Sequence, residues 1–222
     1  FLEPYHFGVL HKNSISPIFF SNLCLFHPFG PHLRVTYPRR SIESLRDLSE
    51  EEWDLVTHTA LVYVLFPNTV FVVQADHLEI WRIYPLDNAV DRSVIILDFL
   101  VPEPVISESA GAHWERNLEL VIGTVSNEDF PTGEGIQFGF DSGAQSHLTY
   151  GRNEPALAYF EQTVSEMVLS VLSTFFPSPS AHCFLVPFSF SYYFPFSLPL
   201  FPPSPLLSFL SPFSYPSVSF PC

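Results

Sequence analysis

The sequence predicts a domain of the α+β class, with an antiparallel sheet that is followed along the chain by helices. Between residues 60 and 102, four short runs of β-branched and aromatic residues are separated by turn signals. Beyond residue 106, apolar residues recur at helical spacing in two long segments. The 222 residues suit one such domain with an appendage.

The first part of the chain gives weaker signals. Residues 15–37 are rich in aromatic residues and proline, so we expect an irregular segment that contains short strands. Residues 41–57 are predicted to be helical, and Ser49 and Glu52 have the spacing of a capping box. The acidic residues of this segment are expected to form a solvated helix face.

The strand predictions fall on residues 61–66, 70–74, 78–84 and 94–101, which we expect to form an antiparallel meander. Turn residues at 67–68 and 86–88 separate two pairs of these strands. His77, Glu79 and Trp81 alternate with more apolar neighbours. This alternation indicates one face on a core and one face that is exposed or lines a cavity.

Two helices are predicted after the strands. The first covers residues 107 to about 125, and Pro131 is expected to close it or to open the next segment. Gly133 and Gly135 form an isolated Gly-x-Gly, which we expect to be a turn. The second helix, at 155–174, carries an apolar stripe that is expected to pack against the sheet.

The composition excludes several classes of partner. The formal net charge is −14, with 9 Lys and Arg against 23 Asp and Glu, so we expect neither nucleic acid nor a membrane as a partner. Three cysteines lie far apart, which argues against a disulfide framework and for a reducing, cytoplasmic compartment. The chain starts without an initiator methionine or a leader, so we expect a truncated N-terminus.

Residues 175–222 differ in composition from the rest of the chain. They are mostly Phe, Pro, Ser and Leu, and they contain no Asp, Glu, Lys or Arg. Prolines interrupt the apolar run at 184–201, so we do not expect a membrane span there. We expect a domain at 1–174 followed by a low-complexity tail that is disordered or mis-translated.

Two histidines near the start of the chain, His6 and His11, are the strongest candidates for a chemical site. Two imidazoles with one carboxylate form the 2-His-1-carboxylate face of non-haem Fe(II) sites. A spacing of five residues turns the two side chains apart on a regular α-helix, so we expect a bend, for which Gly8 is a candidate. Glu3 lies one turn before His6, on the face where a carboxylate orients an imidazole. Spacing alone equally allows two ordinary histidines.

Cys24-x-x-His27 has the spacing of half a Rieske cluster site. A cluster needs four ligands, and the matching Cys-x-His half is absent upstream. We therefore expect Cys24 to be a buried thiol in an aromatic cluster.

The pattern Glu3-x-x-His6-x4-His11 resembles the iron-binding signature of Rieske-type aromatic-ring-hydroxylating oxygenase alpha subunits. The stretches at 29–34, 63–68, 128–129 and 151–154 are similar to the catalytic domain of that family, in the same order. The resemblance covers about residues 1–170, the catalytic (C-terminal) domain without the N-terminal Rieske domain. It implies a helix-grip (START-like) fold, in which a curved antiparallel sheet wraps around a long C-terminal helix.

The resemblance also implies the site residues. In the family, the second member of an acidic pair is the carboxylate ligand, so His6, His11 and Asp129 are expected to hold Fe(II). Glu128 is the alternative ligand, and without the resemblance Asp129 is equally a surface residue or an N-cap. The family relays electrons through a carboxylate at the position of Glu3, which is therefore the expected catalytic residue. Aspartate is commoner there than glutamate, which leaves the geometry of the relay open.

The activity implied by the resemblance is insertion of dioxygen-derived oxygen into an aromatic or other apolar substrate. The electrons come from a Rieske [2Fe–2S] cluster on a neighbouring subunit, which a reductase or ferredoxin reduces, in homo- or hetero-oligomers based on trimers. Ligands for this cluster are absent from the chain, so we expect a fragment that is not active alone. The sequence distinguishes neither the substrate nor dihydroxylation from monohydroxylation or demethylation. Two alternatives stay open, an apolar-ligand carrier without metal and an inactive fragment.

Overall fold

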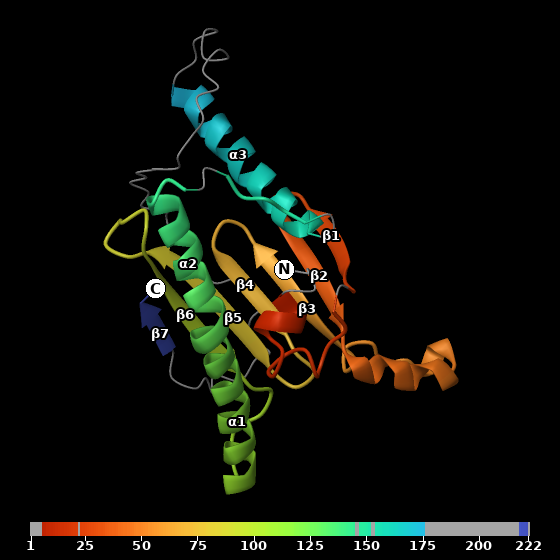
Figure 1. Cartoon of the computed structure of the whole chain (residues 1–222). Helices are drawn as coiled ribbons and strands as arrows, with labels where there is room; N and C mark the ends of the chain where they lie inside the picture. The colour runs from red at the N-terminus through yellow and green to blue at the C-terminus, as the bar shows by residue number, and fades with distance from the viewer. Residues whose placement is uncertain (1–5, 22, 145–146, 152–153, 176–217, 222) are drawn as a thin grey trace.

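The computed structural model describes residues 6–21, 23–144, 147–151, 154–175 and 218–221. Its centre is a seven-stranded antiparallel sheet in which each strand pairs with the next along the chain (Figure 1). The strands are β1 Leu25–Phe29, β2 His32–Pro38, β3 Thr59–Leu65, β4 Thr69–Val73, β5 Leu78–Pro85, β6 Ser93–Leu100 and β7 Val218–Pro221.

The four strands predicted between residues 60 and 102 correspond to β3–β6, and the meander is confirmed. Both predicted turns are present. At the β5–β6 turn, Asp87 and Asn88 adopt positive φ angles of 52° and 58°, which short polar side chains tolerate better than branched ones.

The segment expected to be irregular contains the β1–β2 hairpin, so the expected short strands are present. The hairpin turn needs a left-handed residue, and Gly30 supplies it with a φ of 58°. Cys24 packs against the buried cluster of Phe7, Phe19 and Ala60 as expected, but it is partly rather than fully buried.

Residues 41–57 do not form the predicted α-helix. They contain two 3₁₀ helices, Arg40–Asp47 and Glu50–Glu52, which are separated by extended backbone at Leu48 and Ser49. The capping box of Ser49 and Glu52 is confirmed, but it starts the second short helix. Ser49 explains why one continuous helix does not form. A capping residue adopts extended dihedrals, so it ends any helix that precedes it.

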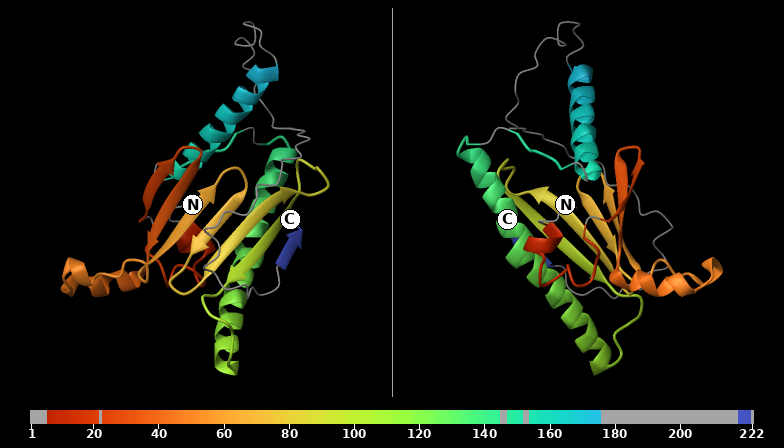
Figure 2. Two further views of the ribbon diagram at one scale, coloured as in Figure 1. Left: turned by 180° about the vertical axis from the view of Figure 1, so that it is seen from behind. Right: turned by 45° about the vertical axis from the view of Figure 1, so that its right-hand side comes forward.

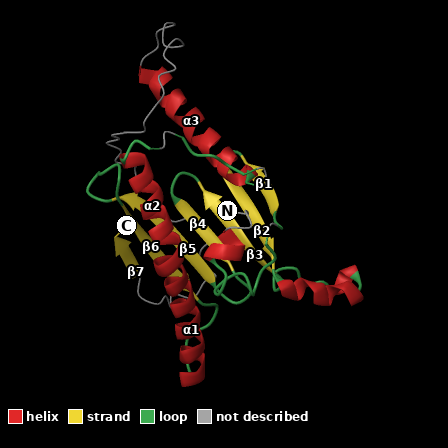
Figure 3. Ribbon diagram, in the orientation of Figure 1, coloured by secondary structure: helices red, strands yellow, loops and turns green. Residues whose placement is uncertain are grey.

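A long helical rod crosses one face of the sheet in front of β5 and β6 (Figures 1 and 3). It consists of α1 Glu108–Thr124, the π-helical turn η4 Val125–Asp129 and α2 Phe130–Asp141, and the backbone stays right-handed helical through both junctions. Pro131 lies in the first turn of α2, so it opens a new helical segment, which is one of the two outcomes predicted for it.

The predicted turn at Gly133 and Gly135 is wrong, because both residues lie inside α2. Neither has a positive φ angle, and a Cβ at either position would have open space around it. Glycine adopts helical dihedrals as readily as turn dihedrals, and Pro131 fixes a helical φ just before them. The Gly-x-Gly spacing alone does not separate the two outcomes.

The second predicted helix is confirmed as α3 Pro155–Phe175. Its first turns pack on the sheet, where Tyr159 and Phe160 contact Phe26 and Phe66. Its later turns extend away from the sheet (Figure 2), and Met167 is exposed, contrary to the predicted stripe. The apolar stripe predicts which face of α3 packs on the sheet, but it does not predict how many turns of the helix the sheet covers.

The sheet is concave toward the helices, and this arrangement is the expected helix-grip fold. Leu33, Val35 and Ala60 are buried on the concave face, and Leu97 and Phe99 are almost fully buried farther along the sheet. The expected tail at 175–222 lies outside the described residues apart from Phe175 and β7, so its character stays a prediction. In the described part of the chain, no helix is long and apolar enough to cross a membrane.

Candidate metal centre

The first described segment is the π-helical turn η1 His6–Leu10, which lies between the helical rod and the sheet (Figure 1). The backbone N–H of His11 donates to the carbonyl of His6 at 2.9 Å, a bond that spans five residues. This wider turn places residues five apart on one side of the backbone. The Nε2 atoms of His6 and His11 therefore lie 2.9 Å apart, and a π turn rather than a bend at Gly8 brings them together.

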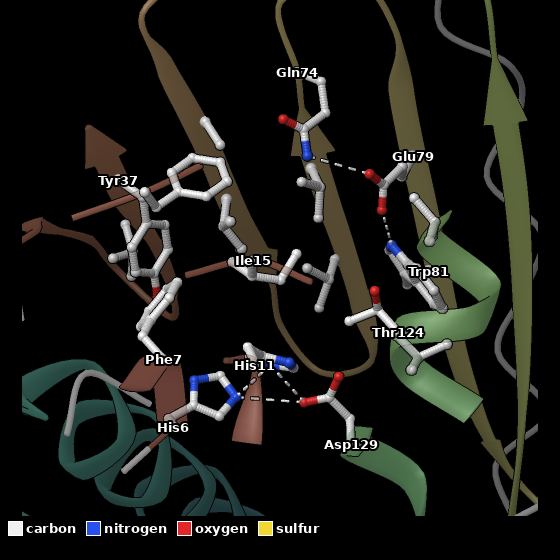
Figure 4. Close-up of a pocket in the computed structure, with 18 of the residues that line it drawn as sticks. His6, Phe7, His11, Ile15, Tyr37, Gln74, Glu79, Trp81, Thr124 and Asp129 are labelled. Atoms are coloured by element: carbon white, nitrogen blue, oxygen red, sulfur yellow. Dashed lines mark hydrogen bonds and ion pairs between the residues drawn. The ribbon is translucent and has the colours of Figure 1, made fainter. Parts of the chain in front are cut away.

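The rod contributes a carboxylate to the same point. Asp129 is the last residue of η4, and its Oδ1 lies 3.4 Å from His6 Nε2 and 3.3 Å from His11 Nε2. Pro131 has no N–H to donate within the helix, and its ring crowds the carbonyl one turn earlier. A wider π-helical turn at this point accommodates the ring. The irregular turn before Pro131 thus carries Asp129 on the side that faces the histidines (Figure 4).

These three side chains fit a divalent metal ion. Their donor atoms all lie within 4.8 Å of one another. Two ligands at about 2.1 Å from a metal are roughly 3.0 Å apart at a right angle and roughly 3.4 Å apart at a tetrahedral angle. The observed separations of 2.9, 3.3 and 3.4 Å lie close to this range. Two imidazoles and a carboxylate are the donor set of non-haem Fe(II) sites.

Glu128, the alternative ligand, has a different place. Its Oε2 accepts a hydrogen bond from Nδ1 of His11 and another, 2.6 Å long, from the hydroxyl of Ser14. Nδ1 of His11 therefore carries a proton, and Nε2, which faces His6 and Asp129, is the nitrogen that would bind a metal once it is deprotonated. Glu128 is therefore placed to orient a ligand rather than to be one.

The carboxylates change the ionisation of the cluster. Burial works to lower the pKa of His11, but hydrogen bonds and charge from Asp129 and Glu128 outweigh it, and the pKa is raised above 6.5. Burial works to raise the pKa of Asp129, but His11 and His6 lower it to about 2. At neutral pH, Asp129 is therefore an anion that attracts either protons or a metal cation to the two imidazoles.

The cluster opens onto a cavity of about 660 Å³ between the sheet and the rod. Most of its wall is aliphatic or aromatic, with side chains from β2 to β5, η1, the rod and the start of α3. Alternate residues of each strand face it, which confirms the cavity-lining alternation of His77, Glu79 and Trp81. Figure 4 shows Glu79 and Gln74 on the opposite side of the cavity from the His6, His11 and Asp129 cluster.

The structure thus brings together three of the four predicted site residues, His6, His11 and Asp129. Glu3 lies outside the described residues. Sequence reasoning missed Ser14 and Thr124, which lines the cavity. No motif marks Ser14, whereas Thr124 lies five residues before Asp129, the same spacing that separates His6 from His11.

Comparison with known families agrees with this geometry. The model of the family described as ring hydroxylating alpha subunit (catalytic domain) matches residues 1–170. The chain belongs to this family. A search of curated proteins and a search of solved structures find no match. As a member of this family, the chain is the catalytic domain of a ring-hydroxylating oxygenase, and such oxygenases are oxidoreductases. The resemblance noted in the sequence is therefore confirmed.

Proposed function

We propose that this domain binds one ferrous ion through His6, His11 and Asp129 and adds oxygen from dioxygen to an apolar substrate held in the adjoining cavity. The observation that carries the proposal is the convergence of three metal-binding side chains on the rim of a large apolar cavity. Because three side chains of the described residues would hold the ion, further coordination positions would remain for other ligands from the cavity.

The residues of the chain have distinct roles in this proposal. The Nε2 atoms of His6 and His11 and the Asp129 carboxylate hold the ion, and Glu128 keeps His11 in the tautomer that can bind it. The aliphatic walls exclude water and hold the substrate beside the site. The bound iron would supply the redox chemistry with dioxygen, using electrons from a Rieske [2Fe–2S] cluster.

We further propose that this cluster lies outside the described residues and is reduced by a reductase or ferredoxin. Cys24 is the only cysteine in the described part of the chain, and a cluster needs four Cys or His ligands. Glu3 is proposed to relay the electrons to the iron site, and an oligomer is proposed to bring the cluster near it. Whether one or two oxygen atoms enter the substrate is not predicted.

The test is a single turnover of the full chain loaded with Fe(II), given a chemical reductant, ¹⁸O₂ and naphthalene. Mass spectrometry of the product is expected to show one or two ¹⁸O atoms, and His6→Ala is expected to give none. His58→Ala is the matched control, because His58 bonds Ser41 and does not line the cavity. If His6→Ala keeps naphthalene affinity and the parent forms no product, the alternative of an apolar-ligand carrier is supported instead.

A further inference from the structure

The cavity wall opposite the metal centre carries a buried carboxylate, Glu79, which is 4% exposed and faces a mostly apolar space. Burying a carboxylate costs several kcal/mol unless it is well paired. Three donors hold it, since Gln74 and His77 reach Oε1 at 3.3 Å each and the Trp81 indole N–H donates to Oε2 at 2.9 Å. The group is thus fixed in place at the cavity surface (Figure 4).

The hydrogen bonds of Glu79 leave one acceptor position open. A carboxylate offers about four lone-pair sites on its two oxygens. Within the described residues, Oε1 has two partners and Oε2 has one, Trp81. The remaining site on Oε2 can accept a hydrogen bond from a ligand, and a carboxylate accepts but does not donate.

The surroundings of Glu79 already balance its charge. The ring of His77 lies between Asp76, 2.8 Å from Nδ1, and Glu79, 3.3 Å from Nε2. Burial works to lower the pKa of His77, but hydrogen bonds and charge from Glu79 and Asp76 outweigh it, so the pKa is raised and the cation is favoured. On the other side, the guanidinium of Arg39 donates to Gln74. His113 Nε2 also lies 3.1 Å from Asp76 Oδ2, so two imidazoles and a guanidinium surround the two carboxylates. Their negative charge is offset within the chain, and the open site favours a neutral donor over an ammonium group.

A second polar group on the cavity wall has spare capacity. Thr124, on α1, is 8% exposed and lines the cavity, and within the described residues its hydroxyl has no hydrogen-bond partner. It lies five residues before Asp129, on the helical wall rather than on the sheet. Its Oγ1 is buried beneath the cavity surface, so Thr124 is a competing partner for a polar substituent only if its side chain turns toward the cavity.

We propose that Glu79 is a specificity-determining residue and that the substrate is an apolar ring or chain bearing a hydroxyl group, which donates to Oε2 of Glu79. Glu79 lies across the cavity from His6, His11 and Asp129 (Figure 4), so the hydroxyl points away from them and the apolar end toward them. This orientation rests on the proposed function, because only a metal at the triad makes the apolar end the reacting end. The hydroxyl preference itself depends on the cavity alone.

The test compares 2-naphthol with its isostere 2-methylnaphthalene, and with the one-atom-longer 2-naphthylmethylammonium, by calorimetry at pH 7 on the full chain without metal. A hydrogen bond to a charged acceptor predicts that the parent binds 2-naphthol roughly tenfold or more tighter than 2-methylnaphthalene. Glu79→Gln keeps the shape but removes the charge, and should reduce this ratio to about threefold or less. Glu166→Gln, on the exposed face of α3, should leave the ratio unchanged.

The ratio of the affinities for 2-naphthol and 2-methylnaphthalene shows whether Glu79 recognises the hydroxyl. If Glu79 only supported the fold, Glu79→Gln would change both affinities together. Equal affinity for the two neutral probes, or tighter binding of the ammonium probe, would overturn the proposal. A ratio that collapses in Thr124→Val but not in Glu79→Gln would also overturn it and move the hydroxyl to the helical wall. Iron binding, measured separately on the same proteins, reports on the proposed function independently of these outcomes.

Discussion

At the scale of single residues, the metal centre depends on two adjacent carboxylates with different roles. Asp129 is the proposed ligand, and Glu128 orients a ligand histidine. Asp129 lies within 3.4 Å of both imidazole Nε2 atoms, whereas Glu128 bonds the far nitrogen of His11. The acidic pair was visible in the sequence, but the assignment of its members came from the resemblance to a family. Residue types alone do not reveal which carboxylate faces which nitrogen, because that depends on the local turn of the helix.

Glu128→Gln should weaken Fe(II) binding without abolishing it. Loss of a carboxylate that orients a ligand histidine typically costs about 10- to 100-fold in metal affinity. The same change removes one of the groups that raise the pKa of His11, so protons should compete with the metal only at lower pH. Fe(II) titrations from pH 5.5 to 8 should show weaker binding at pH 8 and a lower pH midpoint than in the parent. An unchanged affinity at pH 8 would contradict the role assigned to Glu128.

His77 should make the stability of the fold depend on pH. Burial works to lower its pKa, but Glu79 and Asp76 outweigh burial and raise the pKa above 6.5. A raised folded-state pKa stabilises the fold fully below about pH 6.5, and this contribution is lost as the pH rises through the folded-state pKa. His77→Gln should therefore flatten the fall of Tm between pH 6.5 and 8. A parallel fall in both proteins would show that His77 is not charged in the fold.

At the scale of elements, periodicity predicted the central strands and the two long helices, because a half-buried sheet and an amphipathic helix repeat regularly. It missed both π-helical turns, η1 and η4, which carry the candidate metal ligands. A π-helical turn differs from an α-helical turn by about one residue, and neither the composition nor the apolar pattern of so short a segment reveals that difference. The same reasoning mistook a helical Gly-x-Gly for a turn.

Gly133→Ala should stabilise the protein. Gly133 is exposed within α2, and an added Cβ would meet nothing within 4 Å. Alanine in a helix is favoured over glycine by about 0.5–1 kcal/mol, which raises Tm by roughly 1–4 °C in a domain of this size. Gly143→Ala is the control, because Gly143 has a φ of 70°, where a side chain is strained. Calorimetry should show opposite shifts for the two variants, and destabilisation by Gly133→Ala would argue against the helical assignment.

At the scale of the whole molecule, the sheet and the rod form two walls, and the metal centre closes one side of the space between them. The first turn of the chain and a residue 123 positions farther along meet there. The family resemblance anticipated this meeting, and neither hydropathy nor spacing predicts a contact between segments so far apart. The polar anchor at Glu79 went unrecognised for another reason. Its donors Gln74, His77 and Trp81 lie within five residues of it in the sequence, but spacing alone does not show that their side chains converge on one carboxylate.

The most direct test of the central claim is the iron content of the full chain after anaerobic reconstitution with Fe(II). One iron per chain is expected in the parent, and none in His6→Ala or Asp129→Ala, since each variant loses one of three ligands. His58→Ala and Asp141→Ala, whose side chains bond Ser41 and Gln137 away from the cavity, should keep the iron. A folded parent that takes up no iron, or an Asp129→Ala protein that keeps it, would contradict the account.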